Sequence, residues 1–207
     1  MSVDVIELSA IERDALAELA NIGVSRAATS LGQMLGEQVL LSVPTVQIVA
    51  RETAAQFVDH STAPKLVAVR QTFEGPFSGR ALLIFPEARS LELVRAIMGQ
   101  EHSISDIVNL EHEALAEMGN IILNGCLASI ANVLHRTMRM SLPSVVRGNG
   151  ATLFSEPEAA GNSVLFLYID FVIKSRDLHG FIALLMDAPA IATLKAIVQD
   201  FIKSVEL

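Results

Sequence analysis

Residues 10–49 read AIERDALAELANIGVSRAATSLGQMLGEQVLLSVPTVQIV, and residues 109–148 read NLEHEALAEMGNIILNGCLASIANVLHRTMRMSLPSVVRG. At a constant offset of 99 residues, 12 of these 40 positions carry the same residue without a gap, far more than two unrelated amphipathic helices would share. A weaker similarity follows between residues 78–99 and residues 178–198. The chain is therefore a tandem duplication, and each half is small for a stable domain. We predict one domain, residues 1–207, built of repeats over about 8–100 and 107–207.

Each repeat is expected to run helix, three strands and helix. Ser9 and Glu12 form a capping-box pattern that starts a long helix ending at Leu35, where Gly36 is a plausible stop. The second long helix is expected to start after Asn109 and to end near residue 135. The predicted strands are 39–49, 65–75, 80–85, 138–146, 164–173 and 181–186, the short helices are Glu87–Met98 and Pro189–Val205, and the loops are 51–64 and 147–162. This order predicts an α/β (α+β) fold with about six mainly antiparallel strands and helices packed on the sheet.

Composition excludes several classes of protein. With 51% hydrophobic and 18% charged residues, the 207-residue chain can bury a sizeable core, so it is not disordered. The net charge of −8 argues against nucleic acid or anionic lipid as the main partner, because phosphates attract clustered Lys and Arg. A single cysteine, Cys126, excludes a disulfide framework, and the five histidines lack metal-ligand spacing.

The sequence also lacks a convincing membrane or targeting segment. The longest uncharged stretch, Met118–Leu134, is 17 residues long and contains three asparagines, whereas a lipid-spanning helix needs about 20 mostly apolar residues. The N-terminal residues lack the basic-then-apolar order of a secretory signal. We therefore expect a cytoplasmic protein that has neither a membrane nor a nucleic acid as partner.

Each predicted long helix carries one continuous polar stripe, because residues three and four apart lie on the same face. The stripes consist of Asp14, Glu18, Asn21 and Ser25 in the first repeat and of Glu113, Glu117, Asn120 and Asn124 in the second. A solvated helix face is the ordinary explanation for such a pattern. However, the Glu18/Glu117 and Asn21/Asn120 pairs are identical in the two copies, while the adjacent position is Arg13 in one and His112 in the other. Asn costs about 0.5 kcal/mol relative to Ala inside a helix, which favours a functional reason for keeping it twice.

A glutamate and an asparagine at this spacing can orient other groups but cannot perform covalent chemistry here. No histidine lies at a matching spacing to activate a nucleophile. A carboxylate can pair with a partner's lysine, and a carboxamide can both donate to and accept from one water molecule. Side-chain amides orient the attacking water in phosphoryl hydrolysis. The stripes therefore permit a device that positions a water molecule on a docked partner.

The patterns Asp14-x3-Glu18-x2-Asn21-x22-Pro44 and Glu113-x3-Glu117-x2-Asn120-x22-Pro143 resemble the duplicated signature of the CheC/FliY/CheX family of chemotaxis phosphatases. Glu113 departs from that signature, which usually has Asp or Ser at this position. The resemblance covers nearly the whole chain. Two signature copies and no FliN-like segment make the sequence similar to a CheC-type member rather than to FliY or CheX.

The resemblance implies a CheC-like fold with pseudo-twofold symmetry, two sites on one face, and a role in two-component chemotaxis signalling as a hydrolase. The implied substrate is a phosphorylated CheY-type receiver domain, a response regulator that carries an aspartyl phosphate and supplies Mg2+, so no cofactor of the protein's own is expected. Glu18 and Glu117 would pair with the receiver's active-site lysine, Asn21 and Asn120 would orient the water, and Asp14 and Glu113 would contribute to substrate binding. CheD is a further partner that the resemblance allows, and a monomer is expected. The alternative is a non-catalytic phospho-receiver-binding protein or flagellar-switch adaptor on the same fold.

Overall fold

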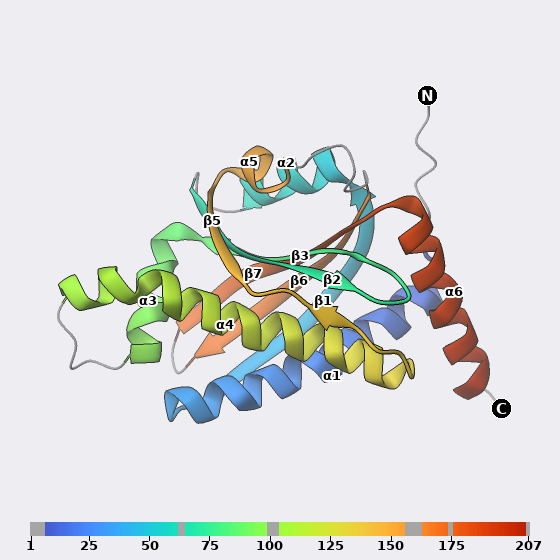
Figure 1. The fold of residues 1–207 in the computed structure, drawn as a ribbon, viewed down its shortest axis with the longest axis horizontal. Helices are drawn as coiled ribbons and strands as arrows, with labels where there is room; N and C mark the ends of the chain where they lie inside the picture. Colours follow the sequence, from blue (N-terminus) through green and yellow to red (C-terminus); the bar gives the residue numbers. More distant parts are fainter. Residues whose placement is uncertain (1–6, 62–64, 99–103, 156–162, 174–175, 206–207) are drawn as a thin grey trace.

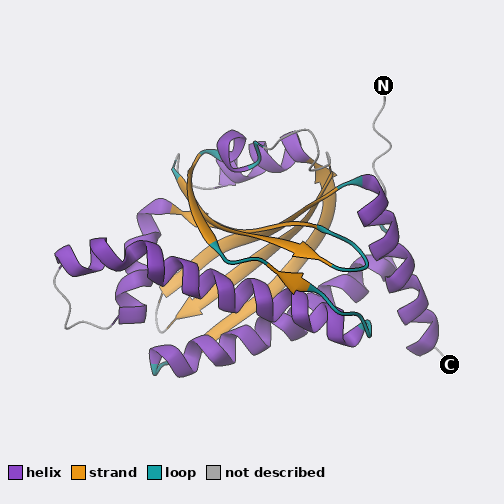
Figure 2. Cartoon of the chain, in the orientation of Figure 1, coloured by secondary structure: helices purple, strands orange, loops and turns teal. Residues whose placement is uncertain are grey.

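The computed structural model describes residues 7–61, 65–98, 104–155, 163–173 and 176–205, which form a curled antiparallel sheet with helices on both faces (Figures 1 and 2). The helices are α1 (Ala10–Leu35), α2 (Arg51–Ser61), α3 (Glu87–Met98), α4 (Ile104–Val133), α5 (Gly150–Leu153) and α6 (Ala188–Val205). The strands are β1 (Val39–Ala50), β2 (Leu66–Glu74), β3 (Gly79–Pro86), β4 (Arg139–Met140), β5 (Ser144–Gly148), β6 (Ser163–Ile173) and β7 (Arg176–Met186).

Both ends of α1 follow the sequence prediction. The Glu12 amide donates to Ser9 Oγ at 3.3 Å, and the Ser9 amide donates to Glu12 Oε2 at 2.7 Å, which completes the capping box. Gly36 ends the helix in the left-handed conformation, with φ of 63°. In contrast, α4 begins five residues before Asn109, because the run Ile104–Asn109 contains no glycine or proline that would interrupt a helix.

The two repeats exchange strands within the sheet. The strand order is β1-β6-β7-β3-β2-β4, with β5 also paired to β2, and every pairing is antiparallel. Thus β1 of the first repeat pairs with β6 of the second, while β4 and β5 of the second repeat pair with β2 of the first. Each repeat supplies an edge strand to the hairpin of the other.

The strand registers carry the predicted pseudo-twofold symmetry. At the centre, Leu83 of β3 pairs with Ile182 of β7, and these residues are separated by the repeat offset of 99. On the two flanks, Val46 pairs with Leu167, and Val145 pairs with Val69. Val145 lies 99 residues after Val46, and Leu167 lies 98 residues after Val69. The symmetry therefore holds, with one residue fewer between β5 and β6 than between the equivalent strands β1 and β2. The pseudo-twofold axis therefore passes between Leu83 and Ile182.

Two layers of helices bury the two faces of the sheet. Helices α1 and α4 lie side by side in opposite directions on one face, and α2 and α5 cover the other (Figure 1). A Cβ atom on Gly23 of α1 would lie 2.6 Å from the Cα of Cys126 of α4, so this glycine permits the close helix contact. The segment Leu110–Val133 of α4 is long and apolar enough to cross a membrane, but 61% of its most apolar window is buried inside the fold, as in a core helix.

Three further sequence predictions were wrong in detail. The predicted loop 51–64 contains α2, whose buried residues Ala54, Ala55 and Val58 face the sheet. The predicted loop 147–162 contains α5, and its residues 156–162 lie outside the described part of the chain. The predicted strand 138–146 is divided into β4 and β5, because Pro143 has no N–H to donate to the ladder, so the described sheet has seven strands rather than about six.

Candidate functional site

The two polar stripes lie on the outer sides of α1 and α4. Glu18 and Glu117 are exposed, as are Asp14 and Glu113 at the start of each stripe. Asn21 and Asn120 are half-buried rather than fully projecting into solvent. Each stripe therefore combines exposed carboxylates with a carboxamide whose orientation depends on the underlying strand.

In the first repeat, the Asn21 side chain is bound directly to β1. The Val43 amide donates to Asn21 Oδ1 at 2.7 Å. Val43 lies where the register between β1 and β6 shifts, between Ser42 and Thr45, and it immediately precedes Pro44. Such a bulge leaves a backbone group without its ladder partner, and the asparagine accepts from it. This contact gives a physical reason for the 22-residue spacing between the asparagine and the proline.

In the second repeat, a glutamine takes the place of this direct contact. Gln71 Nε2 of β2 donates to Asn120 Oδ1 at 3.1 Å and to the Ser141 carbonyl oxygen at 2.8 Å. Asn124 Nδ2, one turn further along α4, also donates to Asn120 Oδ1 at 2.8 Å. The carbonyl oxygen of Asn120 thus accepts two hydrogen bonds, which fills its acceptor capacity.

The difference between the sites has a cause in the sequence. Gln71 is only 1% exposed, and its counterpart at the 98-residue offset is Ile169, which is fully buried. An isoleucine cannot bridge helix and strand, so Asn21 bonds to the backbone instead. Gln71 is not among the site residues that the sequence predicted. The sequence does contain a sign of its role. Val67, Val69, Gln71 and Phe73 are every second residue of β2 and all are buried, and Gln71 is the one polar residue among them.

The second site also contains polar atoms that are unsatisfied. Gln71 Oε1 and Asn124 Oδ1 are buried and have no hydrogen-bond partner among the described residues. Unpaired buried oxygens are rare in proteins and call for a reason. Within the described chain, the Nδ2 groups of Asn21 and Asn120 also make no hydrogen bond. Both sites can therefore fix a carboxamide by its oxygen and present its N–H groups to a bound molecule.

The structure does not bring the two stripes into one site. Asn21 contacts β1 at one edge of the sheet, and Asn120 is linked to β2 and to the segment after β4 at the opposite edge. Both lie on the sheet face that α1 and α4 cover, as expected, but they form two separate surfaces.

A second duplicated glutamate has a structural role. Glu12 is buried between α1 and α6, where Gln199 donates to its Oε1 and Lys195 Nζ lies 3.5 Å from its Oε2. Burial alone would raise the pKa of Glu12, but the hydrogen bonds from Ser9 and Gln199 and the charge of Lys195 together lower it. Its counterpart Glu111 accepts from Ser90 Oγ at 2.7 Å and pairs with Arg147 at 2.9 Å. Repetition in both halves therefore marks packing residues as well as site residues.

In the part of the chain that the structure describes, the other reactive side chains form no group that indicates a further site. Cys126 is fully buried, and burial raises its pKa to about 12, so it is a residue of the core. Among the described residues, no three His, Cys, Asp or Glu side chains are grouped closely enough to bind a metal ion.

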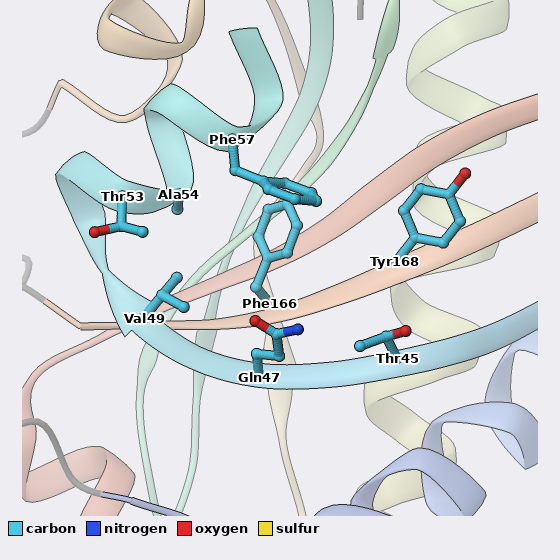
Figure 3. Close-up of a pocket in the computed structure, with 8 residues that line it drawn as sticks. All are labelled: Thr45, Gln47, Val49, Thr53, Ala54, Phe57, Phe166 and Tyr168. Carbon is cyan, nitrogen blue, oxygen red and sulfur yellow. The ribbon is translucent and has the colours of Figure 1, made fainter. Parts of the chain in front are cut away.

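A small pocket of about 170 Å3 lies on the opposite face of the sheet, between α2, β1 and β6. Figure 3 shows Phe57 of α2 lying over Phe166, and their ring centres are 5.6 Å apart in an edge-to-face contact. Burial, followed by the charge of Asp170, raises the pKa of Tyr168 at one end of the pocket. Half of the eight lining residues are apolar, and the set contains no paired nucleophile and base, so we assign no chemistry to this pocket.

Comparisons with known proteins agree with this architecture. The family model described as Chemotaxis phosphatase CheX matches residues 67–167, and the CheC-like family model matches residues 11–48. The CheC1 protein of Halobacterium salinarum is 26% identical over 161 residues, which are 77% of this chain and 81% of that protein. The CheY-P phosphatase CheC of Bacillus subtilis is 24% identical over 137 residues, or 65% of each chain. The crystal structure of Thermotoga maritima FliY superposes with a TM-score of 0.76 at 18% identity, covering 95% of this chain and 100% of that one.

The curled antiparallel sheet and the duplicated helix pair therefore define a protein of the CheC-like fold. The two family models match regions that contain Glu18 and Asn21 in one case and Glu117 and Asn120 in the other. Both repeats of the chain are thus similar to the CheC/FliY/CheX family of chemotaxis phosphatases.

Proposed function

We propose that this protein accelerates hydrolysis of the aspartyl phosphate on a CheY-type receiver domain. One observation carries the proposal, and it occurs in both repeats. An exposed glutamate stands one helical turn before an asparagine. The side-chain carbonyl oxygen of this asparagine accepts an internal hydrogen bond, while its Nδ2 group makes none within the described chain. The name of the Bacillus subtilis relative, a CheY-P phosphatase, supports the same substrate.

The reaction needs only positioning from this chain. Glu18 or Glu117 pairs with the receiver's lysine, and Asp14 or Glu113 adds negative charge beside it. Asn21 or Asn120 orients a water molecule in line with the phosphorus–oxygen bond. The water oxygen attacks phosphorus, the bond to the aspartyl carboxylate breaks, and inorganic phosphate and a free carboxylate result. Mg2+ belongs to the receiver and offsets the phosphoryl charge there, so the phosphatase contributes geometry.

The internal hydrogen bonds suit this role because they fix the carboxamide before the partner arrives. A side chain that is already oriented loses less conformational freedom on docking, and this lowers the cost of reaching the reactive geometry. The direct bond to Val43 and the bridge through Gln71 are two ways to achieve this restraint.

The test is a phosphate-release assay with a phosphorylated CheY-type receiver. We expect the double variant Asn21→Ala/Asn120→Ala to reduce the rate to that of the receiver alone, since both water-orienting groups are removed. Each single variant should keep the activity of the other site. Asn132→Ala is the matched control, because Asn132 is an exposed asparagine near the end of the same helix α4. Full activity in the double variant would contradict the assignment.

The non-catalytic alternative makes a different prediction in the same assay. A phospho-receiver-binding protein or flagellar-switch adaptor would bind the phosphorylated receiver without raising the rate of phosphate release. Both asparagines are present in this chain, which favours catalysis. Binding of CheD, a cytoplasmic location and a monomeric state stay predictions, the last of which light scattering can check against the chain mass of 22.2 kDa.

A further inference from the structure

The two candidate sites, around Asn21 and Asn120, differ in an exposed apolar side chain. Leu142, which precedes Pro143 in the second repeat, is 89% exposed. Its counterpart at the 99-residue offset is Val43, which is 3% exposed and belongs to the core. The other large apolar residues on the described surface are between 36% and 60% exposed. Single exposed leucines are common on proteins, so the position of Leu142 has to carry the argument.

Leu142 is linked to the second site through the backbone of Ser141. The Ser141 carbonyl oxygen and Asn120 Oδ1 accept hydrogen bonds from the same atom, Gln71 Nε2. The residue that follows Ser141 is therefore adjacent to the group that orients Asn120. In the first site, where Ile169 replaces Gln71, the equivalent Val43 bonds to Asn21 directly and turns its side chain into the core. The polar bridge and the exposed leucine occur together in the second site.

The backbone around Leu142 is restrained. The Ser141 amide donates to the Thr72 carbonyl oxygen at 2.9 Å, and the Thr72 amide donates to Ser141 Oγ at 2.9 Å. Ser141 Oγ in turn donates to the Leu142 carbonyl oxygen at 3.0 Å. A residue before proline is also confined to extended conformations. The leucine side chain is thus presented to solvent from a fixed segment, which reduces the entropy lost when a partner covers it.

We propose that Leu142 is an apolar docking residue of the second site and packs against the receiver domain when Asn120 reaches the aspartyl phosphate. This inference rests on the proposed function. The receiver is the occupant because the leucine continues the surface that Glu117 and Asn120 form for it. An apolar side chain within a rim of charged groups is the usual composition of an interface centre. In the first site the counterpart, Val43, is buried, so that site binds the receiver more weakly.

The test uses the full chain with the first site disabled by Asn21→Ala. In this background we expect Leu142→Ala to raise KM for the phosphorylated receiver roughly tenfold and to leave kcat within about twofold, because it removes docking contact rather than the water-orienting group. A receiver trapped with beryllium fluoride should bind the same variant roughly tenfold more weakly in calorimetry. Leu40→Ala is the matched control, since Leu40 is a 54% exposed leucine on β1 at the other edge of the sheet.

The outcomes separate the two proposals. If the Asn21→Ala protein hydrolyses the phosphate but Leu142→Ala changes neither KM nor affinity, the docking inference is wrong and the proposed function stands. If the Asn21→Ala protein binds the trapped receiver without hydrolysis, the calorimetric comparison alone decides the role of Leu142. If the unaltered protein does not bind the receiver, both proposals fail.

Discussion

Asn21 and Asn120 occupy equivalent positions, yet different groups donate to their carbonyl oxygens. Asn21 depends on one backbone amide, that of Val43, which every residue type except proline would supply. Asn120 depends on two side-chain amides, Gln71 and Asn124, each of which leaves its own oxygen buried and unpaired. A buried oxygen without a donor costs free energy. At this site the protein accepts that cost to keep one carboxamide oriented.

Gln71 is therefore expected to be a positioning residue for Asn120. In the Asn21→Ala background, Gln71→Ile should lower kcat about 10- to 100-fold with little change in KM, because a displaced reactive group loses rate rather than affinity. The free energy of unfolding should stay within about 1 kcal/mol of the parent, since the change also removes an unpaired buried oxygen. Steady-state phosphate release and urea denaturation measure the two quantities.

The counterpart in the first repeat supplies the control for Gln71. Ile169→Leu alters a buried strand residue of β6 without touching the second site, so it should leave kcat in the Asn21→Ala background unchanged. If Gln71→Ile and Ile169→Leu both lower the free energy of unfolding and both lower kcat, Gln71 only supports the fold.

At the scale of helices, Glu12 connects elements from different repeats. It lies in the first turn of α1 in the first repeat, and its partners Lys195 and Gln199 lie on α6 of the second. Glu111 of α4 accepts from Ser90 of α3 in the first repeat, the equivalent exchange. Each long helix is therefore fixed in place by a short helix of the other half.

Replacing Glu12 should make stability less dependent on pH. Glu12→Gln is expected to cost about 1–3 kcal/mol in the free energy of unfolding at pH 7, because it weakens charged hydrogen bonds in a buried position. The folded-state pKa of Glu12 lies below its ordinary value of 4.5. The stability that the Glu12 carboxylate contributes is therefore fully present above pH 4.5. It is lost as the pH falls through the lowered pKa of the folded state. Urea denaturation at pH 7 and at successively lower pH should show the wild-type advantage shrinking.

An exposed glutamate provides the comparison. Glu74→Gln, at the solvent-exposed end of β2, should change the free energy of unfolding by less than about 0.5 kcal/mol at either pH. A constant difference between Glu12→Gln and wild type across the acid range would mean that the carboxylate charge contributes nothing.

At the scale of the whole molecule, repetition and periodicity predicted the fold but not the differences between its halves. The repeat offset, the capping box and the alternating strands predicted the symmetry, both ends of α1 and most strand positions. Helix α2 was missed because Ala54, Ala55 and Val58 give only a weak apolar face. Gln71 and Leu142 were missed because their meaning depends on neighbours about 50 and 20 residues away in sequence, which periodicity does not report.

The exchange of strands leads to a last prediction, that the two repeats unfold as one unit. Removing either repeat would leave the hairpin of the other without its outer strand, since β1 pairs with β6 and β5 with β2. Calorimetry of the full chain should show one transition with an unfolding enthalpy of about 145 kcal/mol near 60 °C, from the usual value per residue. The van't Hoff enthalpy should equal the calorimetric one. If the van't Hoff enthalpy were about half of the calorimetric enthalpy, or if two peaks were resolved, the repeats would unfold independently despite their shared sheet.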